Sequence, residues 1–154
     1  MVKNYFIRLK IRYNPKDLIK YINSRLNKKS IYNYWKNPDA NNLPETYLDN
    51  SDYVIKRTNY LVNFISGYSD KNDAILELGC NVGRNLFYLY KTGFKNLTGI
   101  EINDQAVEML YQHYPEMKEN FAVYCDSIEN VIKTIPDDSF DMVFSVAVLQ
   151  QIHN

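Results

Sequence analysis

A glutamate and two glycines stand close together after the first short apolar run of the second half of the chain. The segment 77–83 reads ELGCNVG. Gly79 and Gly83 allow the backbone to turn sharply and to approach a ligand. A helix that begins there directs free backbone N–H groups at the same place, which favours an anionic group. Glu77 lies inside the apolar run, where a carboxylate is costly without a partner, so a cationic or amine-bearing ligand would satisfy it.

Acidic residues also end the next two predicted strands. Glu101 closes a strand at 97–102 and lies 22 positions after Gly79 (101 − 79). An acid about 20 residues beyond a glycine loop can accept hydrogen bonds from two ribose hydroxyls. Asp126 and Ser127 follow a strand at 121–124, where Asp126 could contact a nucleobase, cap the next helix, or do both. A solvated strand end is the alternative interpretation of Glu101.

Alternating strands and helices must position these residues. Strands are expected at 74–78, 97–102, 121–124 and 141–148, with helices around 86–90, 106–114 and 128–132. This alternation predicts a parallel sheet with right-handed crossover helices. Ligands of such sheets bind beyond the carboxyl ends of the strands, where the strand order reverses. The residues that follow each strand are therefore the candidates for a binding site.

The first 68 residues have a different pattern. A helix is expected from Pro15 to about residue 26, then an extended or loop connection over 30–50 that carries Trp35, then a helix over 51–66. Arg57 interrupts the apolar stripe of this last helix, and it either reaches solvent, pairs with an acid or contacts a ligand. We therefore divide the chain into an N-terminal helical segment, 1–68, and an α/β core, 69–154.

Composition and charge exclude several classes of protein. The 18 Lys and Arg residues balance 18 Asp and Glu residues, which gives no electrostatic reason to expect nucleic acid or an anionic membrane. No apolar run approaches the ~18 residues of a membrane span. The charged start of the chain lacks the apolar core of a signal peptide, so the cytoplasm is the expected location. Cys80 and Cys125 are too few for a disulfide framework or a four-ligand zinc site, and we expect no metal.

Taken together, the motifs of residues 73–152 resemble the class I, Rossmann-like, S-adenosylmethionine-dependent methyltransferases. The resemblance rests on segment 77–83, on Glu101, on Asp126-Ser127 and on the fourth-strand segment 139–149, in that order. Asn81 stands where the family most often has Gly, and Asn tolerates a positive φ better than most residues. The resemblance implies a Rossmann-like, mostly parallel sheet with flanking helices, and S-adenosyl-L-methionine as the cofactor.

The resemblance also implies a role for each site residue, and none of them is a nucleophile. Glu77 would face the methionine amino group of the cofactor, and Glu101 would hold the ribose. Trp35, Tyr47 or Tyr53 of the N-terminal segment, on the acceptor side, would either close over the site or serve as packing residues. The remaining candidates give backbone approach, pack on or contact the adenine, or lie below the reacting centre: Gly79, Cys80, Asn81 and Gly83 in the loop, Ile102, Asp126 and Ser127 at the adenine, and Ser145 in the fourth strand.

The family fold has seven strands, and this sequence supplies four. We therefore expect an incomplete fold, either a truncated product or a fragment. A dimer partner or a missing C-terminal segment would cover the exposed edge of the fourth strand. The predicted function is in-line transfer of a methyl group to a small molecule or another acceptor. The alternative is a catalytically incomplete cofactor-binding fragment or an interaction module.

Two other enzyme classes fit the motifs less well. A nicotinamide-dependent oxidoreductase would need Gly-x-Gly-x-x-Gly, and Asn81 and Gly83 stand at the wrong offsets for it. A nucleic-acid methyltransferase is disfavoured by the neutral charge and by the absence of an Asn/Asp-Pro-Pro-Tyr signature after the fourth strand.

Overall fold

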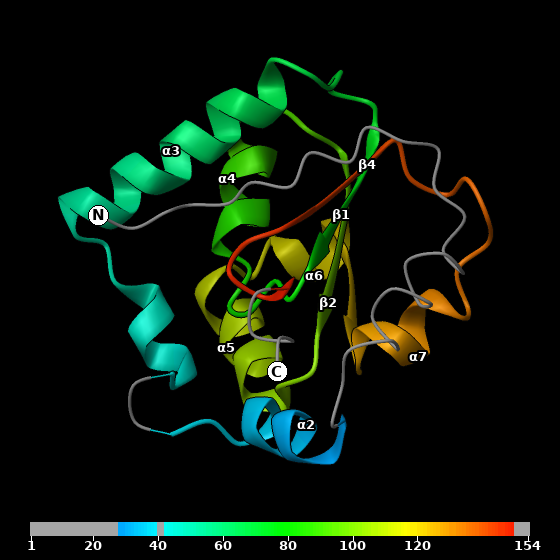
Figure 1. The fold of residues 1–154 in the computed structure, drawn as a ribbon. Helices are drawn as coiled ribbons and strands as arrows, with labels where there is room; N and C mark the ends of the chain where they lie inside the picture. Colours follow the sequence, from blue (N-terminus) through cyan, green and yellow to red (C-terminus); the bar gives the residue numbers. More distant parts are fainter. Residues whose placement is uncertain (1–27, 40–41, 150–154) are drawn as a thin grey trace.

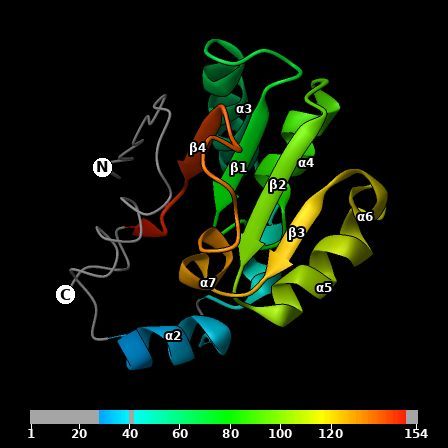
Figure 2. The same cartoon turned by 90° about the vertical axis from the view of Figure 1, so that its right-hand side faces the viewer.

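The computed structural model describes residues 28–39 and 42–149. A single sheet of parallel strands has the order β3-β2-β1-β4 (Figures 1 and 2). The strands are β1 (Ala74–Leu78), β2 (Asn96–Glu101), β3 (Ala122–Cys125) and β4 (Met142–Ser145). The predicted Rossmann-like α/β arrangement is confirmed for this part of the chain.

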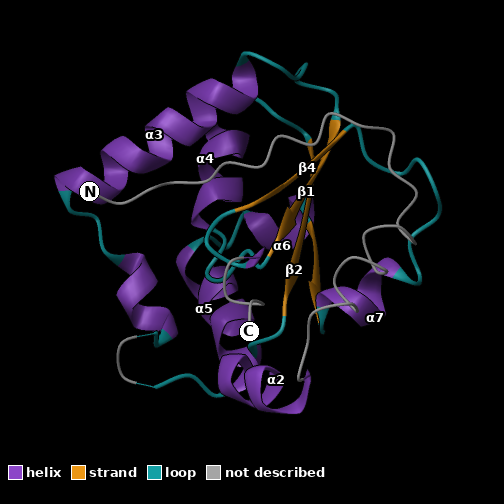
Figure 3. Cartoon of the chain, in the orientation of Figure 1, coloured by secondary structure: helices purple, strands orange, loops and turns teal. Residues whose placement is uncertain are grey.

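Helices cover both faces of the sheet (Figure 3). They are α2 (Lys28–Lys36), the 3₁₀ helix η1 (Pro44–Leu48), α3 (Asp52–Ser66), α4 (Arg84–Lys91), α5 (Asp104–His113), α6 (Met117–Asn120) and α7 (Ile128–Ile132). Side chains of α3, α4, α5 and α6 form the larger core cluster on one face. Side chains of α7 pack with Leu76, Leu78 and Ile100 on the other face.

Burial on both faces explains the nearly continuous apolar sequence of β1. Because side chains alternate along a strand, Ile75 and Glu77 point to the face covered by α3 and α4, while Leu76 and Leu78 point to α7. Glu77 therefore lies on the same face as α4, although its neighbours on that face are apolar. The strand places this carboxylate at its carboxyl end, where the loop to α4 begins.

Local capping fixes where the helices that follow the strands begin. The side chain of Asn103 accepts a hydrogen bond from the Ala106 N–H at 3.1 Å and caps α5. The Ser127 hydroxyl accepts one from the Asn130 N–H at 3.2 Å and caps α7. Both caps hold a helix N-terminus directly after a strand of the sheet.

Three expectations from the sequence need correction or fall outside the description. The connection over 30–50 is not extended throughout, because α2 continues to Lys36 and η1 lies at Pro44–Leu48. The apolar face of α2 covers only about two turns, too short for a clear periodicity. The fourth strand ends at Ser145 rather than 148, and Ala147 has a φ of 61°, which an extended strand does not allow. The helix expected from Pro15 lies outside the described residues.

None of the described helices combines the length and apolar character that crossing a membrane requires.

Gly99 in β2 allows the sheet to approach α4 and the loop after β1, which yields a testable prediction. A Cβ at Gly99 would lie 2.6 Å from the Sγ of Cys80 and 2.9 Å from Cδ1 of Leu86, both buried. We expect Gly99→Ala to lower the free energy of unfolding by about 1–3 kcal/mol in urea denaturation, because the core is overpacked. Gly67→Ala is the matched control, since its Cβ would lie 3.4 Å from the nearest atom at a φ of −79°. Equal stability of the two variants would contradict this account.

Candidate functional site

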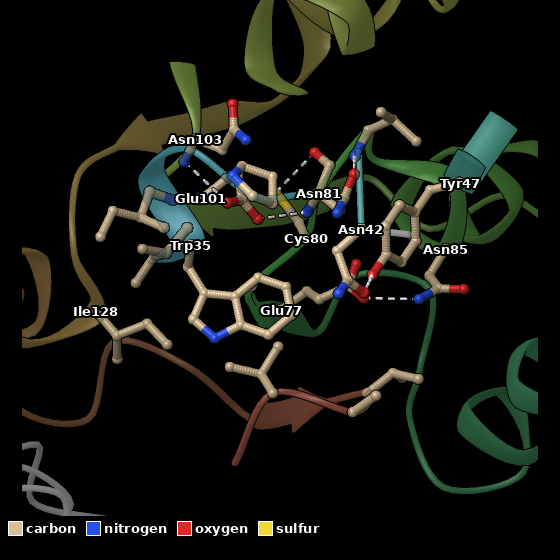
Figure 4. A pocket seen from close by; sticks show the side chains of 18 of the residues that line it. Trp35, Asn42, Tyr47, Glu77, Cys80, Asn81, Asn85, Glu101, Asn103 and Ile128 are labelled. Atoms are coloured by element: carbon tan, nitrogen blue, oxygen red, sulfur yellow. Dashed lines mark hydrogen bonds between the residues drawn. The ribbon is translucent and has the colours of Figure 1, made fainter. Parts of the chain in front are cut away.

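A cavity of 230 Å³ opens at the carboxyl ends of β1, β2 and β4 (Figure 4). It lies where the order of strands reverses, because β1 has β2 on one side and β4 on the other. The loop after β1, the end of β2, the start of α7 and residues 146–148 form its core side. The other side is formed by Tyr32, Trp35, Pro38, Asn42, Tyr47 and Arg57, which we call the N-terminal wall.

The loop after β1 is bound to β2 by its own backbone. The N–H groups of Gly79 and Cys80 both donate to the carbonyl oxygen of Ile100, at 2.8 and 3.0 Å. Asn81 adopts a φ of 48°, and its side-chain oxygen accepts from the Val82 N–H at 2.8 Å. The left-handed conformation expected of Asn81 is therefore present, and its side chain supports the turn locally.

The Gly79 position has no room for a side chain. Gly79 has a φ of 71°, and a Cβ there would lie 2.3 Å from Cγ2 of Val148. Val148 belongs to the segment after β4 and also lines the cavity. The glycine therefore lets the β1 loop and the segment after β4 approach each other at the floor of the cavity.

Glu101 joins the loop after β1 to the end of β2. Its Oε2 accepts from the Asn81 N–H at 2.7 Å, and its Oε1 accepts from the N–H groups of Ile102 and Asn103, both at 2.9 Å. The side chain is 7% exposed. Burial raises the pKa of Glu101, while its three N–H donors act in the opposite direction. These donors hold the carboxylate in one orientation at the edge of the cavity.

Glu77 is the most deeply buried charged side chain of the cavity, with 1% exposure. Its Oε1 accepts from Nδ2 of Asn85 at 2.7 Å, whereas Oε2 is buried without a hydrogen-bond partner among the described residues. Burial raises the pKa of Glu77 to about 8; the Asn85 amide opposes this shift, and the charge of Glu101 adds to it. The free protein at neutral pH therefore holds Glu77 mainly in its protonated form.

The structure brings most of the predicted site residues together. The cavity is lined by Glu77, Gly79, Cys80, Asn81, Glu101, Ile102 and Ser127. Gly83, Asp126 and Ser145 are not among its lining residues.

Each of these three residues has a different environment. A Cβ at Gly83 would lie 2.5 Å from Cδ1 of Leu110, so this glycine serves packing against α5. Asp126 is exposed, and its Oδ1 accepts from the Ser127 N–H at 2.6 Å and from Nδ2 of Asn130 at 3.1 Å. Ser127 rather than Asp126 caps α7, so the helix-capping role considered for Asp126 is wrong, while its nucleobase role stays a prediction. Ser145 is half-buried in β4.

Several cavity residues escaped the sequence analysis. Asn85 is the second residue of α4, and nothing in the sequence distinguishes it from a surface asparagine. Ile128 at the start of α7 was expected only as a helix residue, and Asn103, the N-cap of α5, was not considered for the site. Arg57 does line the cavity, as the interrupted stripe of α3 allowed, whereas Tyr53 is 61% exposed and does not line it.

The N-terminal wall is attached to the core through Arg84. This side chain, in the first turn of α4, is 8% exposed and donates a hydrogen bond to the carbonyl oxygen of Asp49. Asp49 directly follows η1, which packs against α5. Arg84 therefore ties the segment that carries Tyr47 to the helix that follows the β1 loop.

The fold and the cavity define a Rossmann-like α/β protein with a ligand site at the carboxyl ends of its strands. Residues 76–154, half of the chain, match the family model described as a methyltransferase domain. The chain therefore belongs to this family of methyltransferase domains. A comparison with curated proteins found no match.

Solved structures of methyltransferases resemble the chain at low sequence identity. The plantazolicin methyltransferase BamL, solved with a desmethylPZN analog and SAH, is 19% identical over 80% of this chain and 46% of its own, with a TM-score of 0.47. A provisionally assigned RNA methyltransferase from Pyrococcus horikoshii is 18% identical over 73% and 50%, with a TM-score of 0.46. Geranyl diphosphate C-methyltransferase from Streptomyces coelicolor is 10% identical over 73% and 47%, with a TM-score of 0.42. The chain spans half or less of the length of these three proteins.

The buried state of Glu77 predicts how stability depends on pH. Its pKa rises from 4.5 in the unfolded chain to about 8 in the folded protein, so the folded state loses stability as the pH rises through this window. Each unit of pKa shift corresponds to roughly 1.4 kcal/mol of lost stability. We expect Glu77→Gln to remove this loss and therefore to be more stable than the wild type at pH 8. Urea unfolding at a series of pH values measures the effect.

Glu119→Gln, at an exposed position of α6, is the matched control and should keep the wild-type pH dependence. Parallel pH profiles of wild type and Glu77→Gln would show that Glu77 is ionised in the folded protein at neutral pH.

Proposed function

We propose that the chain binds S-adenosyl-L-methionine in this cavity and transfers its methyl group to a small-molecule acceptor. The observation that carries the proposal is the Oε2 atom of Glu77, which is buried, unpartnered among the described residues and adjacent to the β1 loop. A buried carboxylate oxygen without a donor is costly, and a bound cation or ammonium group removes that cost. S-adenosyl-L-methionine carries both a sulfonium and an amino group.

The donor set of the cavity also fits the rest of this cofactor. The three N–H donors on Glu101 leave acceptor capacity on both of its oxygens, since a carboxylate offers about four lone-pair sites. The ribose hydroxyls would donate to these sites. Ile102 and Ile128 supply apolar surface beside them, which suits the adenine. Gly79 and Asn81, with positive φ values, present backbone rather than side chains to the methionine part.

The cofactor would supply an activated methyl group on sulfur. The protein would bind and orient the two reactants and exclude water from the cavity. Correct positioning of two reactants accounts for up to about 7–11 kcal/mol of a barrier in favourable cases. Glu77 and Glu101 would fix the two ends of the cofactor. No catalytic base is assigned, because a side chain is needed only for acceptors that must lose a proton. The N-terminal segment would hold the acceptor, with Tyr47 and Arg57 of the N-terminal wall as its first contacts.

A small molecule is the proposed acceptor class, and the cytoplasm the proposed location. The formal net charge is zero, which offers no attraction to a polyanionic acceptor. The alternative function is a cofactor-binding fragment or interaction module without turnover. Binding of the cofactor with no methyl transfer to any acceptor, alone or with a C-terminal segment or partner added, would favour that alternative.

The cofactor assignment predicts a specific calorimetric result. S-adenosylhomocysteine should bind the purified chain, and Glu101→Gln should weaken the binding about 10–100-fold, because a charged acceptor of ribose hydroxyls is lost. Gln keeps one side-chain oxygen for the backbone donors, and circular dichroism checks that the variant folds. Glu119→Gln should bind like the wild type. A folded wild-type chain that binds neither S-adenosylmethionine nor S-adenosylhomocysteine would refute the assignment.

Proton release gives a second test, which addresses Glu77. At pH 7 the free protein holds Glu77 mainly protonated, and a cation beside Oε2 favours the carboxylate. Binding of S-adenosylhomocysteine should therefore release close to one proton, measured as different heats in two buffers of unlike ionisation enthalpy. Glu77→Gln should bind more weakly and release none. Equal heats in both buffers for the wild type would place the ligand's amino group away from Glu77.

A further inference from the structure

Trp35 is the sole tryptophan of the chain and belongs to the N-terminal wall. It lies in the last turn of α2, three residues after Tyr32, so both side chains share one helix face and both line the cavity. The indole is half-buried. In the view of Figure 4 it extends between the labelled positions of Ile128 and Glu77. α2 thus presents an aromatic surface to the cavity.

A chain of hydrogen bonds orients this surface. The ring of Tyr34 meets the indole of Trp35 edge to face, at 5.1 Å between centroids and 82° between planes. The Tyr34 hydroxyl accepts from Nδ2 of Asn42 at 2.6 Å and donates to Asp39 at 3.1 Å. The Tyr47 hydroxyl donates to Oδ1 of Asn42 at 3.3 Å. Trp35 is therefore held in place from η1 as well as by its own helix.

Two branched aliphatic side chains line the same cavity as Trp35. Ile102 follows β2 and Ile128 begins α7. An indole and two aliphatic side chains around one cavity supply the apolar slot that a flat heterocycle needs. Base-to-indole stacking does not depend on the identity of the base, because every base has a π-face. The ribose acceptor Glu101 lies at the same end of the cavity as this slot.

From this arrangement we propose that Trp35 closes the nucleobase subsite, by stacking on the adenine of the bound cofactor while Ile102 and Ile128 cover its other face. The proposal rests on the cofactor assignment made above and adds a binding residue from α2. It makes α2 part of the cofactor site, whereas the acceptor contacts lie toward Tyr47 and Arg57.

The indole itself reports on this contact. Because Trp35 is the single tryptophan, its fluorescence can be followed in the unmodified chain during titration. We expect quenching by S-adenosylhomocysteine and by adenosine, which carry the base, and none by methionine, which lacks it. The three titrations separate the nucleobase from the amino-acid part of the cofactor.

Two variants test whether the contact contributes to affinity. Trp35→Ala should weaken the binding of adenosine and S-adenosylhomocysteine about 5–100-fold, whereas Trp35→Phe, which keeps an aromatic face, should stay within a few-fold of the wild type. Tyr53→Ala is the matched control, since this exposed aromatic of α3 does not line the cavity. Calorimetry gives the affinities, and circular dichroism verifies the fold of each variant.

The outcomes separate this inference from the proposed function. Wild-type affinity of Trp35→Ala for S-adenosylhomocysteine, or quenching by methionine but not by adenosine, overturns the stacking role and leaves the cofactor assignment intact. If the folded wild type binds neither adenosine nor S-adenosylhomocysteine, the cofactor assignment fails and the stacking role fails with it. Loss of affinity in Trp35→Ala together with near-normal affinity in Trp35→Phe supports the stacking.

Discussion

The hydrogen bond from the Asn81 N–H to the Glu101 carboxylate is the interaction on which the site depends. It joins the loop after β1 to the end of β2, two segments that are 20 residues apart in sequence. The same carboxylate accepts from the backbone at the start of α5, so one side chain sets the relative position of three elements. Its cost is a carboxylate withdrawn from water, and three charge-assisted hydrogen bonds offset that cost. A residue that would hold a ribose therefore also holds the cavity open.

Glu77 and Glu101 place two buried carboxyl groups at one cavity. Burial and the neighbouring negative charge both favour a protonated Glu77, so the free protein stores one proton near the loop. A ligand ammonium group beside Oε2 would take the place of that proton, because a nearby positive charge favours the carboxylate.

The parallel sheet and most of the cavity's core side could be predicted because each depends on local sequence. Gly79 and Asn81 have positive φ values, Asn103 and Ser127 cap helices, and these properties are visible in the residue types themselves. Asn85 reaches the cavity only through tertiary packing, and no periodicity identifies it, whereas Trp35 and Tyr47 line the cavity as the resemblance led us to expect. The helix α2 escaped prediction for the same reason, since its functional face has two aromatic residues and little apolar pattern. Asp126 shows the converse, because this strand-end acid accepts from the Ser127 N–H and Ser127, not Asp126, caps α7.

The N-terminal wall lies outside the sheet, so its side chains can set the selectivity of the cavity for a ligand while the sheet stays the same. The carboxyl ends of the strands provide charge and backbone donors, whose positions are constrained by the sheet. Trp35, Asn42 and Tyr47 come from α2, η1 and the residues between them, which are joined to the core through Arg84 and the Asp49 carbonyl rather than through the sheet. Side chains on this wall can vary without breaking any strand pairing. Under the proposed function the wall would contact the acceptor and the strand ends would hold the cofactor, so Trp35, which stands on the wall and would stack on the cofactor, would answer to both requirements.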